Sequence, residues 1–241
     1  MMQLSDFFRN NKLTITRSRN VLPNVRLAYS RKLLISKFEI DLVLDIGANR
    51  GQWALELLNA GYKQMCVSFE PTREAFKDLE KNASEFRNWH VMNVAVGAEN
   101  TEKILNVAGN NQLSSSFFDM EQSHLDAAPE SRFVTKESVQ MIRLDSWVSK
   151  SKRIFIKIDT QGYEMNILNA IPEEFWRNIS IIEMEVSLIK TYDQPFLIED
   201  HLIFLRRKGY KPFRIENGLA SKAFGQQLQV DIIFIRKELD F

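Results

Sequence analysis

The sequence contains a single cysteine, Cys66, among its 241 residues. An intrachain disulfide and a metal cluster held by several thiolates are therefore excluded. Cys66 stands in the apolar run MCVSF, which is typical of a buried small hydrophobic residue rather than of a nucleophile. No apolar run approaches the roughly 20 residues that a membrane-spanning helix needs, and the N-terminus lacks the apolar core of a secretory signal. We therefore expect a cytoplasmic protein.

Net charge is also nearly absent, at +1, so the chain as a whole gives no reason to expect nucleic-acid binding. The charge is unevenly distributed, because residues 1–38 hold eight Lys or Arg and only one acid, Asp6. We predict that residues 1–38 form a basic, helical N-terminal extension that covers one edge of the domain. The alternative is that it binds an anionic substrate or makes peripheral contact with a membrane.

Apolar runs of strand length alternate with helical patterns, which predicts an α/β fold with a Rossmann-like, doubly wound, mostly parallel sheet. Residues 39–241 show no linker and no repeat, so we expect a single domain. The predicted strands are residues 42–46, 65–69, 89–96, 154–158, 179–186, 210–215 and 230–235.

Residues 99–138 form an insert with weak periodicity, which is typical of a substrate-binding segment. Within it, residues 103–107 are a candidate strand, whereas 110–120 and 124–132 have the composition of loops. Residues 139–142 alternate as an edge strand does.

The stretch DLVLDIGANRGQWA, residues 41–54, has the pattern of a strand, a glycine turn and a helix start. Such a turn puts backbone N–H groups and a helix N-terminus beside the carboxylate of Asp45, an arrangement that binds adenosine-containing ligands. Glu70 ends the next strand, 23 residues beyond Gly47, where an acidic residue accepts hydrogen bonds from ribose hydroxyls. A carboxylate there argues against a ribose 2′-phosphate.

NAD and S-adenosyl-L-methionine both fit that pattern, and the turn distinguishes them. A dinucleotide turn has glycine at three spaced positions, but Asn49 and Gln52 stand at the second and third of these. Asp45 offers a carboxylate for a ligand ammonium group. The pattern therefore favours S-adenosyl-L-methionine, with an NAD-dependent oxidoreductase and a non-catalytic cofactor-binding module as the alternatives.

The sequence resembles the FkbM type of S-adenosylmethionine-dependent methyltransferases over roughly residues 40–235. The matching motifs are VLDIGANRGQWA at 43–54, FEPTREAF at 69–76, NVAVG at 93–97, Ser115-Ser116, RLDSW at 143–147 and IKIDTQGYEMNIL at 156–168. In the last motif Gln161 stands where the family usually has glutamate.

The resemblance implies a seven-stranded class I methyltransferase fold and O-methylation of a hydroxyl on a carbohydrate or secondary metabolite. The acceptor is then a small molecule or a glycan. The cofactor-binding residues that we expect are Asp45, Gly47, Ala48, Asn49, Gly51, Gln52, Glu70, Pro71, Asn93, Ala95, Val96, Ser115, Ser116 and Asp159.

Asp159 ends a buried strand at the predicted pocket and is the first candidate for the base that removes the hydroxyl proton. The alternative is that it caps a helix or holds the cofactor. Lys157 points to the same face two residues earlier, which predicts an ion pair with Asp159. Glu164 is expected to reach back to the turn before its helix. Glu185 is the second candidate base, and no spacing of ligands supports a metal site.

Overall fold

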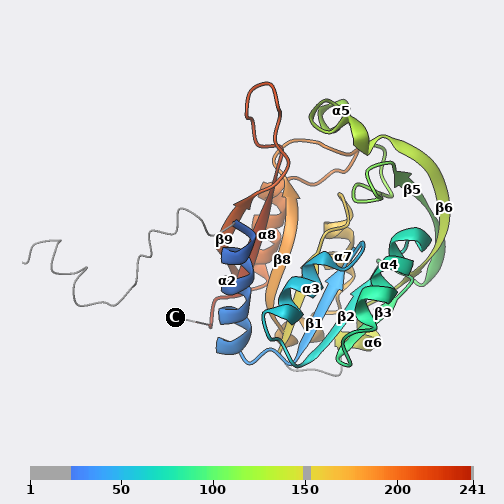
Figure 1. Cartoon of the computed structure of the whole chain (residues 1–241). Helices are drawn as coiled ribbons and strands as arrows, with labels where there is room; N and C mark the ends of the chain where they lie inside the picture. Colours follow the sequence, from blue (N-terminus) through green and yellow to red (C-terminus); the bar gives the residue numbers. More distant parts are fainter. Residues whose placement is uncertain (1–22, 149–152, 240–241) are drawn as a thin grey trace, which may run out of the picture.

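A computed structural model of the chain describes residues 23–148 and 153–239, and its centre is a seven-stranded sheet (Figure 1). The strands lie in the order β3-β2-β1-β7-β8-β10-β9, and only β10 runs antiparallel to its neighbours. This confirms the predicted doubly wound, mostly parallel sheet. The strands are β1 Leu42–Ile46, β2 Met65–Phe69, β3 Trp89–Met92, β7 Ile154–Ile158, β8 Ile179–Ser187, β9 Tyr210–Asn217 and β10 Gln229–Arg236.

Helices cover both faces of the sheet because successive side chains of each buried strand point to opposite sides. Val43 of β1 faces a core built with α2, α3 and α4, whereas the next residue, Leu44, faces a core built with α7 and α8. The helices are α2 Pro23–Lys37, α3 Gln52–Asn59, α4 Arg73–Ala83, α6 Asp145–Val148, α7 Glu164–Ala170 and α8 Ile198–Arg207, with the 3-10 helix η2 Glu173–Asn178.

The N-terminal segment enters the described structure as α2. Its Leu34 and Ile35 are buried in the same core as Leu57 of α3, so this helix is packed against the sheet. The rest of the predicted basic extension, residues 1–22, lies outside the described residues. A division of the chain at residue 38 therefore stays a prediction.

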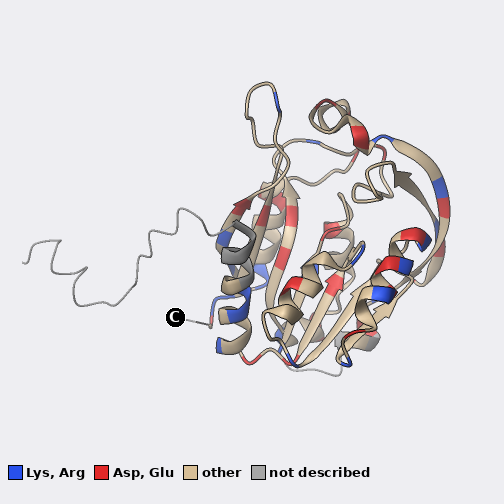
Figure 2. Ribbon diagram, in the orientation of Figure 1, with Lys and Arg blue, Asp and Glu red and all other residues tan. Residues whose placement is uncertain are grey.

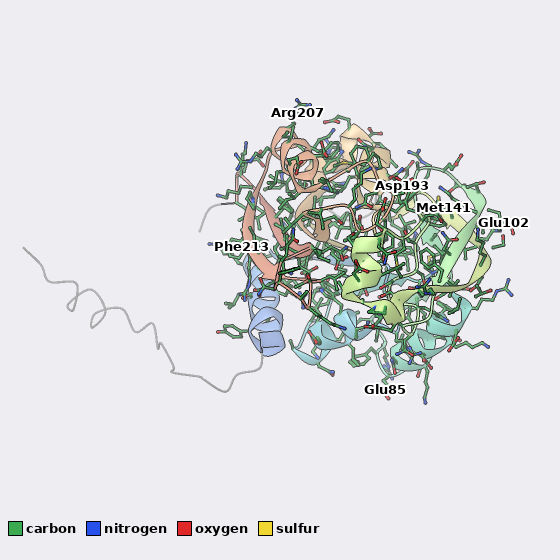
Figure 3. The ribbon with its side chains drawn as sticks, turned by 90° about the horizontal axis from the view of Figure 1, so that it is seen from above. Glu85, Glu102, Met141, Asp193, Arg207 and Phe213 are labelled. Atoms are coloured by element: carbon green, nitrogen blue, oxygen red, sulfur yellow. The ribbon has the colours of Figure 1, made fainter. Side chains whose placement is uncertain are left out.

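The insert forms a second, three-stranded sheet in the order β4-β6-β5, from β4 Ala95–Val96, β5 Thr101–Ala108 and β6 Phe133–Ile142. Figure 3 shows this sheet, with Glu102 and Met141, on the opposite side of the molecule from Arg207 and Phe213. The insert also contains the helix α5 Gln122–Ala127 and the 3-10 helix η1 Pro129–Ser131. The small sheet lies beside β3 and α4 (Figure 1).

Three predictions about this region were wrong. Residues 89–96 are not one strand, because the chain leaves the large sheet after Met92 and residues 95–96 pair with β6 instead. Residues 124–132 are partly helical, and the strand predicted at 139–142 begins at Phe133. β6 carries exposed side chains such as Val134 on its solvent side, so its residues lack the continuous apolar run that reveals a buried strand.

Among the described residues, no helix combines the length and the apolar character that crossing a membrane would require.

Candidate active site

The turn after β1 passes through left-handed backbone at Gly47, Asn49 and Gly51, with φ of 78°, 50° and 83°. A Cβ atom at Gly47 would overlap the carbonyl oxygen of Asp159, so this position requires glycine for space as well as for its φ. A Cβ atom at Gly51 would lie 2.6 Å from side-chain atoms of the core beneath α3. The two glycines let the turn sit against the end of β7 and let α3 begin directly after it.

A pocket lies between this turn, the ends of β2 and β7, and the small sheet. Eight of the predicted cofactor residues line it, namely Gly47, Asn49, Glu70, Pro71, Ala95, Val96, Ser115 and Asp159. The other lining residues are Ile46, Phe69, Val94, Leu105, Gln112, Leu113, Phe117, Thr160, Gln161 and Tyr163. The sequence analysis did not predict these ten residues. Most of them are apolar or belong to the insert, and no motif in the sequence distinguishes them from ordinary core or loop residues. Thr160, Gln161 and Tyr163 stand inside the IKIDTQGYE motif, which was the one available signal.

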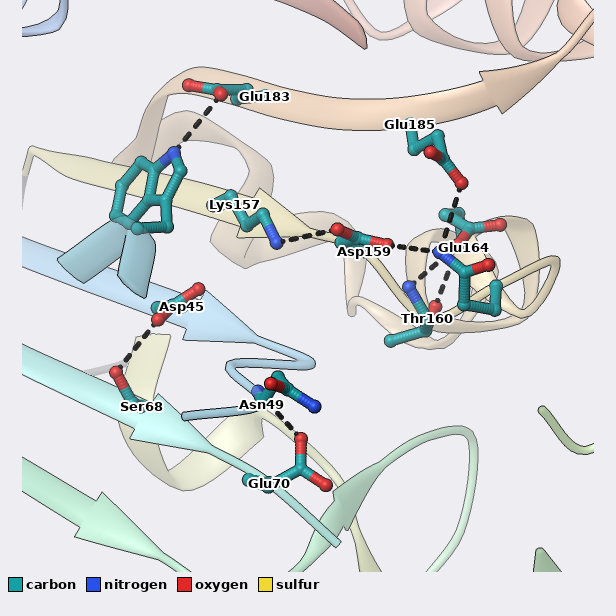
Figure 4. A network of polar contacts seen from close by, with 12 residues as sticks. Asp45, Asn49, Ser68, Glu70, Lys157, Asp159, Thr160, Glu164, Glu183 and Glu185 are labelled. Atoms are coloured by element: carbon teal, nitrogen blue, oxygen red, sulfur yellow. Dashed lines mark hydrogen bonds and ion pairs between the residues drawn. The ribbon is translucent and has the colours of Figure 1, made fainter. Parts of the chain in front are cut away.

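The Glu70 carboxylate is held firmly at the end of β2 (Figure 4). One oxygen accepts from the N–H of Asn49 at 2.8 Å, and the other accepts from the N–H and hydroxyl of Thr72 at 2.8 and 2.6 Å. Burial raises the pKa of Glu70, although these hydrogen bonds act in the opposite direction. The spacing in the sequence predicted that the glycine turn and Glu70 belong to one site, and a direct hydrogen bond from Asn49 to Glu70 joins them.

A loop of the insert covers the Glu70 end of the pocket. Asn111 and Gln112 both have left-handed backbone, with φ of 56° and 66°. The carbonyl of Asn111 accepts from the Asn49 side chain at 3.0 Å. The side-chain oxygen of Gln112 accepts from the N–H of Ala75 at 2.9 Å, and its amide group donates to Glu74 at 2.9 Å. The loop is therefore tied both to the glycine turn and to the first turn of α4.

The two serines of the insert differ in their positions. Ser115 lines the pocket, and its hydroxyl donates to the carbonyl of Gln112 at 2.8 Å. Ser116 is fully buried behind the lining and donates to the carbonyl of Gln161 at 2.7 Å. Ser116 therefore connects the insert to the turn after β7.

At the other end of the pocket, Asp159 lies in a polar network (Figure 4). The predicted ion pair with Lys157 is present, with 3.0 Å between Nζ and Oδ2. The amide of Gln161 donates to Asp159 Oδ1 at 2.7 Å and to Glu185 Oε2 at 3.1 Å. The hydroxyl of Tyr192 donates to the oxygen of that amide at 2.7 Å, which orients its NH2 group toward the two carboxylates. Burial raises the pKa of Glu185 well above its ordinary value.

Glu164 reaches back to the turn before α7, as predicted. Its Oε1 accepts from the N–H groups of Thr160 and Gly162 at 2.9 and 3.2 Å. The carboxylate is buried, and burial raises the pKa of Glu164 to about 7.

Asp45 does not lie where we expected. It is fully buried beneath the turn, does not line the pocket, and accepts from the Ser68 hydroxyl at 2.9 Å. Its Oδ1 has no hydrogen-bond partner among the described residues. Burial raises the pKa of Asp45, with Lys157 acting in the opposite direction. Burial alone would lower the pKa of Lys157, but the carboxylates of Asp159 and Asp45 raise it overall. The side chain lies on the α3 face of the sheet, in register with Lys157 of β7.

A second cavity adjoins the first and shares Asp159 with it. Its lining includes charged side chains of β7, β8 and β10, among them Glu183 and Asp231, together with Arg31 of α2. Glu183 accepts two hydrogen bonds from Arg31 Nε, at 2.8 and 3.2 Å, and one from the indole of Trp53 at 3.1 Å. Three predicted site residues line this cavity rather than the first, namely Ala48, Gln52 and Lys157.

The remaining predicted residues line neither cavity. Gly51 packs closely against Leu79 of α4 and Trp89 of β3, and Glu185 hydrogen-bonds to the Gln161 amide. Asn93 supports the pocket from outside, since its side chain donates to the carbonyls of Glu70 and Pro71 at 2.9 and 3.0 Å.

Comparison of the sequence with models of known protein families identifies one family. The family model described as "Methyltransferase FkbM domain" matches residues 45–212, which is more than half of the chain. With the seven-stranded sheet, this match confirms the expected class I methyltransferase fold. No curated protein matches the chain.

Solved structures that are similar to this chain include several methyltransferases of low sequence identity. A precorrin-6y C5,15-methyltransferase from Geobacter metallireducens GS-15 has 17% identity and a TM-score of 0.45, over 87% of this chain and 88% of its own. An rRNA methylase from Streptococcus thermophilus has 10% identity and a TM-score of 0.48, and the match covers 90% of this chain and 98% of that one. The structure described as "Methyltransferase FkbM" from Methylobacillus flagellatus KT has 12% identity and a TM-score of 0.48, over 80% of this chain and 44% of its own.

Proposed function

The chain belongs to the FkbM methyltransferase family, and we propose that it transfers the methyl group of S-adenosyl-L-methionine to a hydroxyl oxygen of a carbohydrate or secondary metabolite. The observation that carries the proposal is one pocket with Glu70 at one end and Asp159 at the other, beneath the turn from Gly47 to Gly51. The acceptor is a small molecule or a glycan rather than nucleic acid, since the chain has a net charge of only +1.

The residues present fit an adenosine-containing methyl donor. Glu70 can accept a further hydrogen bond from a ribose hydroxyl at Oε2, because Oε2 accepts only one hydrogen bond within the protein, whereas Oε1 already accepts two. The apolar side chains of Phe69, Val96 and Leu105 offer a surface for the adenine ring. Gly47 and Asp159 lie at the end where the amino acid part of the donor would bind.

When bound, the donor supplies a methyl group on a positively charged sulfur, which leaves as a neutral thioether. The protein then has mainly to hold the acceptor oxygen in line with that methyl group. Asp159 is fixed in orientation by Lys157 and Gln161, which makes it a positioning residue at the transfer end. The adjoining cavity over Lys157 and Asp159 is the proposed acceptor site.

Isothermal titration calorimetry tests the donor. The protein should bind S-adenosyl-L-methionine and its product S-adenosyl-L-homocysteine, and should not bind NAD. Glu70→Gln should weaken donor binding roughly 10- to 100-fold, because it removes the charge from hydrogen bonds that are worth about 1.5–3 kcal/mol. The matched control is Glu80→Gln, on an exposed position of α4, which should leave donor affinity unchanged. Binding of NAD alone would refute the proposal and favour an oxidoreductase.

Donor labelled in its methyl group tests the reaction. Incubation with panels of sugars, nucleotide sugars, phenolic metabolites and lipids should give label on a hydroxyl oxygen of at least one class. Label recovered on nitrogen would refute O-methylation while leaving the methyltransferase in place. Tight donor binding without transfer to any class would favour the non-catalytic cofactor-binding module.

A further inference from the structure

The second cavity contains a carboxylate, Asp231, that sequence reasoning did not select. It belongs to β10 and pairs with Glu185 of β8 in the antiparallel register. Residues that pair directly across two strands point to the same face of a sheet, so Asp231 lies on the face that carries Lys157 and Asp159. Figure 2 shows acidic residues along β8 on this part of the sheet. Asp231 therefore faces the proposed acceptor site from the strand next to β8.

Asp231 differs from the other carboxylates of this face in its contacts. Asp159, Glu183 and Glu185 each accept hydrogen bonds from two neighbouring side chains. No hydrogen bond to the Asp231 carboxylate comes from any residue that the structure describes. It lines the cavity, whereas Glu185 does not. A carboxylate that is already fully engaged is a poor proton acceptor, and an unengaged one in a cavity is available to a ligand hydroxyl.

We propose that Asp231 is the catalytic base, which accepts the proton of the acceptor hydroxyl during methyl transfer. This inference rests on the proposed function. The hydroxyl oxygen forms a bond to the methyl carbon, the carbon–sulfur bond breaks, and its electron pair stays on sulfur. The hydroxyl proton moves to the Asp231 carboxylate, which becomes a neutral carboxyl group and afterwards releases the proton to water.

The charges around Asp231 suit this role. Burial is the main cause that raises the pKa of Asp231 to about 7, and nearby carboxylates act in the same direction. A base whose pKa lies near the working pH combines a large ionised fraction with a strong tendency to take a proton. The charged groups that face it are Lys157 and Asp159 of β7, Glu183 and Glu185 of β8, Glu216 of β9 and Arg31 of α2.

The first test needs no acceptor. The carboxyl group of Asp231 is titrated by NMR in protein with isotope-labelled aspartate, and its signal is assigned by its absence from Asp231→Asn. If Asp231 faces the transferring methyl group, the positive sulfur of S-adenosyl-L-methionine should lower the pKa of Asp231 by about one pH unit. S-adenosyl-L-homocysteine has a neutral sulfur at the same place and should lower it much less.

Equal changes with the two ligands, or no change with either, would overturn the assignment of Asp231. Failure of the protein to bind either ligand would instead refute the proposed function, so the two failures are distinguishable.

The second test is kinetic and uses the acceptor class labelled in the screen above. Asp231→Asn keeps the shape of the side chain and should lower kcat at least about 100-fold with little change in KM or in donor affinity. The control is Glu80→Gln, which removes an exposed carboxylate of α4 that lines neither cavity and should leave kcat unchanged. Asp231→Asn that keeps kcat within about threefold of the unaltered protein would show that Asp231 is not the base.

Discussion

The amide nitrogen of Gln161 lies 2.7 Å from Asp159 Oδ1 and is shared with the Glu185 carboxylate at 3.1 Å. One uncharged side chain therefore bridges two acids at the proposed transfer end of the site. This explains why glutamine is suited to a position where the family usually has glutamate. An amide supplies two donors to its neighbours, whereas a third carboxylate would supply none and would repel both.

Gln161→Glu should therefore destabilise the fold at neutral and higher pH, by about 2–4 kcal/mol. The new carboxylate would be crowded by Asp159 and Glu185, so its pKa should lie above the ordinary value for glutamate. The destabilisation should then shrink as the pH falls and the new side chain becomes a donor. Thermal unfolding between about pH 5 and about pH 8 measures it. The control Tyr192→Phe removes the hydroxyl that contacts the Gln161 amide oxygen and the Ser114 carbonyl, and it should cost about 1 kcal/mol at every pH. A loss in Gln161→Glu that does not depend on pH would contradict the bridging role.

Gly47→Ala should abolish donor binding and lower stability. The new methyl group would overlap the Asp159 carbonyl oxygen, and the φ of 78° disfavours any side chain. Gly209→Ala separates the two causes, because Gly209 has a similar φ of 87° but nothing within 4 Å of an added Cβ. We expect Gly209→Ala to cost about 1–2 kcal/mol with unchanged donor affinity, as measured by calorimetry and thermal unfolding. Equal losses in the two variants would mean that crowding at Gly47 has no effect.

Arg31→Met should destabilise the protein by about 3–5 kcal/mol, because it leaves the buried Glu183 carboxylate without its charged partner. The double variant Arg31→Met with Glu183→Gln should recover most of that loss. Lys32→Met, at the exposed neighbouring position of α2, is the control and should change stability by less than about 0.5 kcal/mol. Chemical denaturation measures all three. A small loss in Arg31→Met would indicate that α2 is not part of the cooperative fold.

Stability should depend on pH through Glu164. Burial raises the folded-state pKa of Glu164 to about 7, so the folded protein binds this proton more tightly than the unfolded chain does. The stabilising contribution is thus fully present below the unfolded pKa of about 4.3 and is lost as the pH rises toward about 7. Glu164→Gln cannot ionise, so its stability relative to the unaltered protein should rise over that interval by about 2–3 kcal/mol. A constant difference between the two proteins across this range would argue against a raised pKa.

Glu99→Gln is a suitable control for the pH series, because Glu99 is an exposed residue of the insert. Its unfolding curves should follow those of the unaltered protein at each pH, within about 0.5 kcal/mol.

Much of the central sheet could be predicted from the sequence. The strands at 42–46, 65–69 and 154–158 have the bounds that their apolar runs predicted, because a parallel strand buried on both faces needs apolar side chains at nearly every position. The glycine turn and Glu70 were found because their spacing is set by one strand–helix–strand unit, which is local in the chain. The ion pair of Lys157 with Asp159 follows from two residues on one face of a strand.

The small sheet was not predictable in the same way, because β5 and β6 pair across about 30 residues. Buried and exposed side chains also do not alternate regularly along either strand. Gln112 has no recognisable motif, yet the fold brings its side chain to the first turn of α4. Asp45 had the spacing of a ligand residue, but the fold buries its side chain completely and pairs it with the Ser68 hydroxyl of the neighbouring strand.

Asp231 shows most clearly the difference between what the sequence determines and what the tertiary structure determines. In the sequence it is one acid within the apolar run VDIIFI, which predicts a strand and no site. Its neighbours Glu185 and Asp159 lie 46 and 72 positions earlier in the chain. The sequence by itself determined the strands, the turn and the family, because these depend on residues that are close together. Only the tertiary structure decided which carboxylate is left without a partner, because that depends on strand order and on every side chain packed around the cavity.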